Sequence, residues 1–261
     1  MANIADINGV DLSRIADING VAKANIRDIN GLDVPSASAT LTYIGYEFTE
    51  ENPYNSSNPL VVNIHSSAAV GDLGVLMCAT DNPYSSNGFS DISGWTTEIL
   101  KAEPSGVSVD TEIYCSYKIL TSSDISAGSV TVPYNTNLTF FEGGGYMHIF
   151  RNFDTSTPIA TADNYNSNNQ SSITTPAVTG VVGGFAYAFT AFDGGDGDPV
   201  TTTTSGWTLE SDNDIGTGQY DLTVAIATKN ALTTTTSTGT MAFNFSSSDQ
   251  ARSVMIFIYP E

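Results

Sequence analysis

Two stretches of the chain, VGDLGVLMCATD (70–81) and VGGFAYAFTAFD (182–193), decide the predicted fold, because they align without a gap. Successive side chains of a β-strand point to opposite faces, so alternate residues of each stretch share a face. The residues on one face are Val75, Met77 and Ala79 in the first stretch and Tyr187, Phe189 and Ala191 in the second. The alignment therefore predicts two related strands, each with an apolar face.

The similarity between the two parts of the chain continues beyond these two stretches. The further matches are SGWTTE (93–98) with SGWTLE (205–210), DTEIYCSYK (110–118) with DLTVAIATK (221–229), Gly128 with Gly239, and HIF (148–150) with MIF (255–257). One residue is lost between the first and second of these matches, and the last is further out of step. Residues 67–261 are therefore predicted to consist of two related halves, about 67–153 and 179–261.

The composition favours an all-β fold, because Ser, Thr, Asn and Gly are abundant and no stretch shows helical periodicity. One sheet cannot bury its own apolar face, whereas two related sheets that face each other can. We therefore expect one β-sandwich built from the two half-repeats, with jelly-roll-like connections. Two small β domains side by side are the alternative.

The N-terminal segment contains a second, shorter repeat. IADINGV occupies 4–10, recurs at 15–21, and returns as IRDINGL at 26–32. Asn-Gly is a strong turn signal, so each unit predicts a short extended segment, a turn and another extended segment. Three such units hold too few apolar groups to fold alone, which predicts packing on neighbouring copies or on a larger assembly. The assembly residues are Ile4, Ile7, Asn8, Gly9, Ile15, Ile18, Asn19, Gly20, Ile26, Ile29, Asn30 and Gly31.

These repeats define the domain organisation that we expect. Residues 1–35 form a β-turn-rich assembly or anchoring segment, residues 36–66 form a lead-in with the strand candidate ATLTYIGYEF, and residues 67–261 form the sandwich.

The charge of the chain excludes two classes of partner. With 28 acidic and 8 basic residues, its formal net charge is −20, which disfavours nucleic acid and anionic membrane surfaces. The N-terminus lacks a signal peptide pattern, and no stretch reaches transmembrane length, which predicts synthesis in a cytoplasm without a secretion signal. Cys78 and Cys115 each lie in a strand-like run, where they either pair or remain buried thiols.

Metal binding is the one cofactor prediction. In DGGDGDP (193–199), Asp193, Asp196 and Asp198 supply oxygen ligands of the kind that Ca²⁺ prefers. The alternative is an acidic hairpin tip, and no other cofactor is expected. The two histidines, His65 and His148, are too few for a histidine-rich metal site, and His148 lies in a strand-like pattern.

Aromatic residues beside glycine or polar residues are candidates for ligand recognition on loops. They are Tyr84, Phe89, Tyr146 and Tyr165. Trp95 and Trp207 occupy equivalent repeat positions, which favours paired core anchors over sugar-stacking platforms. No nucleophile elbow, phosphate loop or glycosidase-like set of acids is present, so the sequence predicts no catalytic residues and a protein that is not an enzyme.

The repeated I-x-x-I-N-G-V string resembles the N-terminal repeats of phage virion structural proteins, notably in phages of marine cyanobacteria. The pattern V-G-D-L, S-G-W-T, Y-C-S-Y-K and S-A-G-S-V-T-V resembles a β-sandwich module of phage fibre and decoration proteins. The second half departs from this pattern where Gly184 replaces Asp72. The resemblance implies structural motifs and no catalytic residues.

We therefore expect an exposed fibre or capsid-decoration subunit on the virion surface, with the repeats as its anchor or trimerisation device and closed homotrimeric symmetry. Its partners would be itself, other virion proteins such as capsid or tail, and a host-surface glycan. The alternatives are a carbohydrate-binding module or adhesin, and a surface filament subunit.

Overall fold

The computed structural model places the chain in two compact units, Met1–Thr40 and Leu41–Glu261. In the first unit it describes only the backbone of six two-residue strands and residues 39–40. In the second it describes residues 41–54, 59–81, 89–101, 111–133, 141–194, 200–216, 222–229, 232 and 237–261.

The first unit contains three antiparallel hairpins, one per eleven-residue repeat. Their strands are β1 (Asp6–Ile7) with β2 (Val10–Asp11), β3 (Asp17–Ile18) with β4 (Val21–Ala22), and β5 (Asp28–Ile29) with β6 (Leu32–Asp33). The same register occurs three times, with Ile7 opposite Val10, Ile18 opposite Val21 and Ile29 opposite Leu32. Two residues, Asn-Gly in each repeat, separate the paired strands. The predicted pairs of extended segments are confirmed, and the Asn-Gly residues between them lie outside the described residues.

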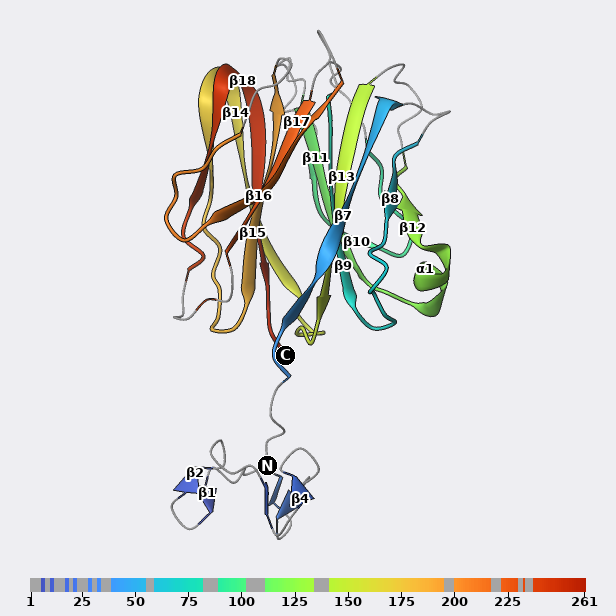
Figure 1. Cartoon of the computed structure of the whole chain (residues 1–261), viewed down its shortest axis with the longest axis vertical. Coiled ribbons are helices and arrows are strands. Elements are labelled where there is room, and N and C mark those ends of the chain that lie inside the picture. The colour runs from blue at the N-terminus through green and yellow to red at the C-terminus, as the bar shows by residue number, and fades with distance from the viewer. Residues whose placement is uncertain are drawn as a thin grey trace. The chain divides into compact units, whose positions relative to one another are not determined.

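The second unit contains two five-stranded antiparallel sheets (Figure 1). Residues 42–151 supply β7 (Thr42–Tyr54), β8 (Val61–Asn63), β9 (Leu73–Asp81), β10 (Thr96–Lys101), β11 (Thr111–Ile119), α1 (Ser122–Ala127), β12 (Ser129–Thr131) and β13 (Phe141–Arg151). Residues 159–258 supply β14 (Ile159–Thr175), β15 (Phe185–Asp193), β16 (Thr208–Ile215), β17 (Leu222–Lys229) and β18 (Met241–Ile258). Among the described residues, no helix is long and apolar enough to cross a membrane.

The two large sheets have the same internal topology. Sheet 1 has the order β10-β11-β9-β13-β7, and sheet 2 has the order β16-β17-β15-β18-β14. The sequence repeat matches four strands of each sheet, β9, β10, β11 and β13 with β15, β16, β17 and β18. β7 and β14 lie before the repeated halves and occupy the same edge position, so the two orders are identical. The all-β sandwich is confirmed, but the strand order gives the jelly-roll connections no support, because one large sheet takes all its strands from residues 42–151 and the other from residues 159–258.

The sheets face each other with their orders reversed. β9 packs against β15, β7 against β16, and β11 against β15 and β18. The core between them mixes residues of both halves, including the predicted faces Val75, Met77 and Ala79 of β9 and Tyr187, Phe189 and Ala191 of β15. The halves therefore form one sandwich and not two separate domains.

Each sheet is also covered on its outer face. The β8/β12 pair covers sheet 1, where Leu60 and Val62 join a buried cluster with Leu76 and Cys78. The end of the long β14/β18 ribbon covers sheet 2, where Met241 and Phe243 pack with Ala186, Ala188 and Phe257. This makes four β layers, and it explains why the central strands β9 and β15 are buried on both faces.

One boundary and one alignment differ from the sequence prediction. β7 and β8 lie in the predicted lead-in, yet β7 is part of sheet 1 and β8 covers it, so the lead-in belongs to the sandwich. The match of HIF with MIF is also shifted by one residue. Phe150 pairs with Leu73, and Ile258 pairs with the equivalent Phe185, which aligns His148 with Ile256. The alignment of HIF with MIF would instead match His148 with Met255, whose side chain points to the opposite face of the sheet.

Candidate functional site

The predicted assembly residues lie in the three N-terminal hairpins. Ile7, Ile18 and Ile29 each end the first strand of a hairpin. The remaining predicted residues lie outside the described part of the chain: Ile4, Asn8, Gly9, Ile15, Asn19, Gly20, Ile26, Asn30 and Gly31. Two-residue strands offer few ladder hydrogen bonds, so hairpins of this size need a partner surface for stability.

The predicted Ca²⁺ ligands are only partly visible. Asp193 ends β15, whereas Asp196 and Asp198 lie outside the described residues. Within the described ranges, no group of three or more His, Cys, Asp or Glu residues is arranged to hold a metal ion. The calcium prediction therefore stays a prediction.

Two of the four predicted ligand-loop aromatics are wrong. Phe89 is 1% exposed and packs on Tyr114, and Tyr146 is fully buried within β13. The stretch 141–147 is a strand and not a loop, because its glycines allow β13 to lie close to neighbouring side chains. Tyr146 connects the sheets, since its hydroxyl accepts a hydrogen bond from Asn213 on β16.

The other two aromatics differ from each other. Tyr84 lies outside the described residues. Tyr165 lies on β14 and not on a loop, and the guanidinium carbon of the buried Arg252 is 4.4 Å from the centre of its ring. A cation over the ring gives Tyr165 a structural role, because the ring offsets part of the desolvation of the arginine.

The two tryptophans behave as core residues to different degrees. Trp207 is 8% exposed, and Lys229 lies over its ring with the ammonium 5.8 Å from the ring centre. Trp95 is partly buried against the cluster on the outer face of sheet 1. The turns before them contain Gly94 and Gly206, whose φ values of +79° and +82° are left-handed. The equivalent glycines and the burial favour packing over sugar stacking.

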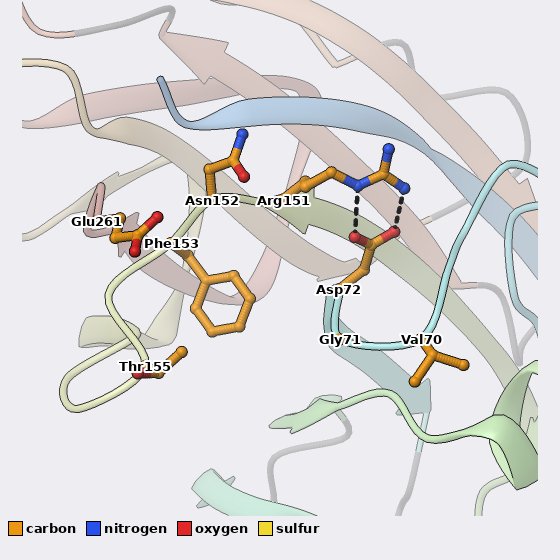
Figure 2. A pocket seen from close by; sticks show the side chains of 8 residues that line it. All are labelled: Val70, Gly71, Asp72, Arg151, Asn152, Phe153, Thr155 and Glu261. Carbon is orange, nitrogen blue, oxygen red and sulfur yellow. Dashed lines mark hydrogen bonds and ion pairs between the residues drawn. The ribbon is translucent and has the colours of Figure 1, made fainter. Parts of the chain in front are cut away.

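The clearest candidate site is a pocket of about 280 Å³ that the sequence did not predict (Figure 2). It is lined by Val70, Gly71, Asp72, Arg151, Asn152, Phe153, Thr155 and Glu261. Two hydrogen bonds of 2.7 Å join the Arg151 guanidinium to the Asp72 carboxylate, which also accepts from the backbone N–H of Ala69. The ion pair raises the pKa of Arg151 above its ordinary value.

The exposure of the ion pair decides what this pocket offers to a ligand. The Asp72 side chain is 3% exposed and its oxygens are engaged, whereas the Arg151 side chain is 42% exposed. Asn152 is held with a left-handed φ of 61°, and its carbonyl accepts from the backbone of Glu261. Arg151 and the Glu261 carboxylate are therefore the charged groups that face a ligand here. The sequence signal for this site was the Asp72–Gly184 difference between the halves.

A second unusual group lies between the sheets. His148 is fully buried, and its Nδ1 lies 3.1 Å from the Tyr43 hydroxyl. Its ring stacks on Tyr187 and Tyr46, and its Nε2 has no hydrogen-bond partner among the described residues. Burial lowers the pKa of His148 to about 3. A neutral, enclosed imidazole of this kind is structural, as its strand-like sequence context predicted.

The cysteines remain free thiols. Both are buried, with Cys78 on the outer face of sheet 1 and Cys115 on the face toward sheet 2. Side chains on opposite faces of one sheet cannot form a disulfide, so the buried-thiol alternative is confirmed. Burial raises the pKa of both thiols, which keeps them protonated and unreactive.

No protein-family model, curated protein or solved structure matches this chain.

Proposed function

We propose that this protein is a non-enzymatic structural subunit of a phage particle, displayed as a fibre or capsid decoration. In this proposal the three N-terminal hairpins anchor the subunit or join three copies, and the sandwich projects outward. The chain is made in the host cytoplasm and acts at the virion surface, with capsid or tail proteins as its neighbours. No catalytic residues are assigned.

The observation that carries the proposal is the repetition of one hairpin register three times. Ile7, Ile18 and Ile29 recur at one position of successive hairpins, eleven residues apart. Three short hairpins with the same register provide equivalent apolar positions but little core of their own, which suits a shared core between symmetric copies. The high negative charge also suits a protein displayed at high local density, because like charges limit non-specific association.

Solution mass tests the assembly role. Light scattering on the full chain should give a trimer, and the triple variant Ile7→Ser, Ile18→Ser, Ile29→Ser should give a folded monomer. The matched control changes Asp6, Asp17 and Asp28 to Ser, one position earlier on the same strands, and should stay trimeric. A full-length monomer would contradict trimerisation by the repeats.

Location needs a separate measurement. Antibodies raised against the sandwich should label the outside of purified phage particles. Label found only in the soluble fraction of the lysate would overturn the virion assignment, whatever the oligomeric state.

A second candidate function is glycan recognition, and the Arg151 pocket is the observation that favours it. Charged and amide groups beside an apolar wall, here Arg151, Glu261 and Val70, are suited to hydrogen-bond sugar hydroxyls and cover a sugar face. A glycan array with the Arg151→Ala variant as control tests this. Binding that survives the substitution would place recognition elsewhere on the molecule.

A further inference from the structure

The edges of the two large sheets differ in how well they are protected against pairing with another strand. Strands at a sheet edge present unpaired N–H and C=O groups, and natural proteins protect them with charges, prolines, bulges or short length. In the described part of the chain, the edge strands of the large sheets are β7, β10, β14 and β16.

Three of these edges carry such protection. β16 exposes Glu210, Asp212 and Asp214 and has a register irregularity after Leu209. β10 is six residues long, has an irregularity between Thr97 and Ile99, and exposes Glu98. β7 contains Glu47, Glu50, Glu51 and Pro53, and two irregularities interrupt its register with β13.

The first part of β14 lacks these features, and the two irregularities of this strand come only after Asn166. Residues Ile159–Asn166, IATADNYN, pair with β18 in an unbroken register, and Asp163 is their single charge. β14 occupies the edge position in sheet 2 that β7 occupies in sheet 1, so the sheet topology allows a direct comparison. One half protects this edge, and the other leaves it open.

Two hydrogen bonds show which backbone groups of β14 point outward. Tyr259 directly follows β18 and donates its backbone N–H to the carbonyl of Pro158. In an antiparallel ladder the backbone groups of alternate residues point to the same neighbour, so those of 257, 255 and 253 also point toward β14. Their partners in β14 are Ala160, Ala162 and Asn164. The Tyr165 N–H is instead bound by the Asn164 side chain. The backbone groups of Ile159, Thr161 and Asp163 therefore point away from the sheet.

We propose that β14 pairs with β14 of a second copy of this chain, antiparallel about a two-fold axis at Ala162. The other edges are poor partners, because β7 and β16 bring acidic side chains toward Asp163, and β10 is short and irregular. In the proposed register Thr161 lies opposite Asp163 of the second copy, so no like charges face each other. Two sheets 2 would then join into one continuous ten-stranded sheet.

The two-fold axis at Ala162 fixes which residues exchange hydrogen bonds between the two copies. Because Ala162 uses its own backbone groups to pair with β18, Ala162 would face its copy as a non-hydrogen-bonded pair, whose Cα atoms lie about 4.5 Å apart. Thr161 and Asp163 would exchange the ladder hydrogen bonds on either side of it. The contact does not involve the N-terminal hairpins. If the hairpins do not trimerise, it gives a dimer, and if they do, it links two trimers.

Site-directed crosslinking tests the register. Under mild oxidation, Ala162→Cys should form a disulfide-linked dimer, since about 4.5 Å between Cα atoms is within disulfide range. Thr208→Cys on the protected β16 edge is the matched control and should stay monomeric by non-reducing mass analysis. The native cysteines are buried and do not interfere. An Ala162→Cys variant that crosslinks no faster than Thr208→Cys would overturn the proposal.

Charge substitutions at one position test the same contact without crosslinking. Thr161→Asp places two acids opposite each other twice per dimer, and Thr161→Lys places a cation opposite Asp163 twice. Sedimentation equilibrium should show dimerisation weakened roughly tenfold by the first and strengthened by a similar factor by the second. Circular dichroism and thermal unfolding check that both variants remain folded. Equal effects of the two substitutions, or no effect of either, would contradict β14 pairing.

Discussion

His148 on β13 and Tyr187 on β15 stack across the interface between the two sheets, with ring centroids 4.7 Å apart and planes 18° apart. The repeat places Ile256 and Val75 at the equivalent positions, so one side of the pseudo-symmetric core is polar and aromatic where the other is aliphatic. Within the described part of the chain, neither the His148 Nε2 nor the Tyr187 hydroxyl has a hydrogen-bond partner. At this contact the burial of two polar groups opposes the stability of the sandwich.

The first prediction concerns pH. The pKa of His148 is about 3 in the folded protein and about 6.5 when unfolded, so the unfolded state binds the proton more tightly. Above pH 6.5 His148 is neutral in both states and does not change the free energy of unfolding with pH. As the pH falls from 6.5 toward 3, it lowers the free energy of unfolding by a total on the order of 5 kcal/mol. Urea unfolding at several pH values measures this slope.

The matched variant for this measurement is His148→Ile, which copies the residue of the other half. Its unfolding free energy should fall less steeply between pH 6.5 and pH 4 than that of the wild type. His65→Asn controls for the other histidine of the chain. Equal slopes for wild type and His148→Ile would show that His148 is protonated without penalty.

The second prediction concerns the Asp72–Arg151 ion pair. Arg151→Ala should destabilise the fold more than Asp72→Ala at pH 7, because it leaves a 3% exposed carboxylate without its cation. The half-exposed Arg151 can be hydrated when Asp72 is removed. Thermal unfolding of both single variants and the double variant gives the coupling between the two residues. Additive losses would show that the pair contributes no interaction.

The third prediction concerns the glycines of β13. A Cβ at Gly145 would lie 2.8 Å from Val62 Cγ2 and 2.9 Å from Cys78 Sγ, so Gly145→Ala should destabilise the fold by about 1–3 kcal/mol. Val62→Ala removes one of these obstacles. The double variant Gly145→Ala, Val62→Ala should therefore lose less free energy of unfolding than the two single variants lose together. Chemical denaturation of the four proteins measures this, and simple additivity would contradict the close approach of β8 to β13.

The fourth prediction concerns the thiols. Cys78 and Cys115 should not react with a thiol reagent in the native protein, and both should react after denaturation. The Thr208→Cys variant provides one exposed thiol as a positive control. Rapid modification of the unaltered native chain would show that the sheets open readily.

The sequence predicted the parts of the fold that repeat. The faces of β9 and β15 and the matched tryptophan turns could be found because two copies of each pattern support the same alignment. The glycine run 143–145 has the pattern of a loop but lies in β13, because the close approach of Val62 from a distant strand leaves no room for a Cβ at Gly145. The lead-in was separated from the sandwich for a similar reason, since nothing local shows that β7 pairs with β13.

The Arg151 pocket and the His148 environment also depend on distant contacts. Asp72 and Arg151 are far apart in the sequence and meet at the ends of two neighbouring strands. His148 acquires its low pKa from burial against Tyr187 of the other half. Single-sequence patterns report faces and turns, whereas these features arise from the way in which the two halves face each other.

The reversed order of the facing sheets is the arrangement that a two-fold dimer of a single half would have. Gene duplication and fusion of such an ancestor would preserve this arrangement in one chain. In a dimer of identical halves, every substitution appears twice across the axis, whereas after fusion each copy changes alone. His148, the Asp72–Arg151 pair and the open β14 edge each occur on one side of the sandwich only, so they are the places where the two-fold correspondence of the sheets is broken.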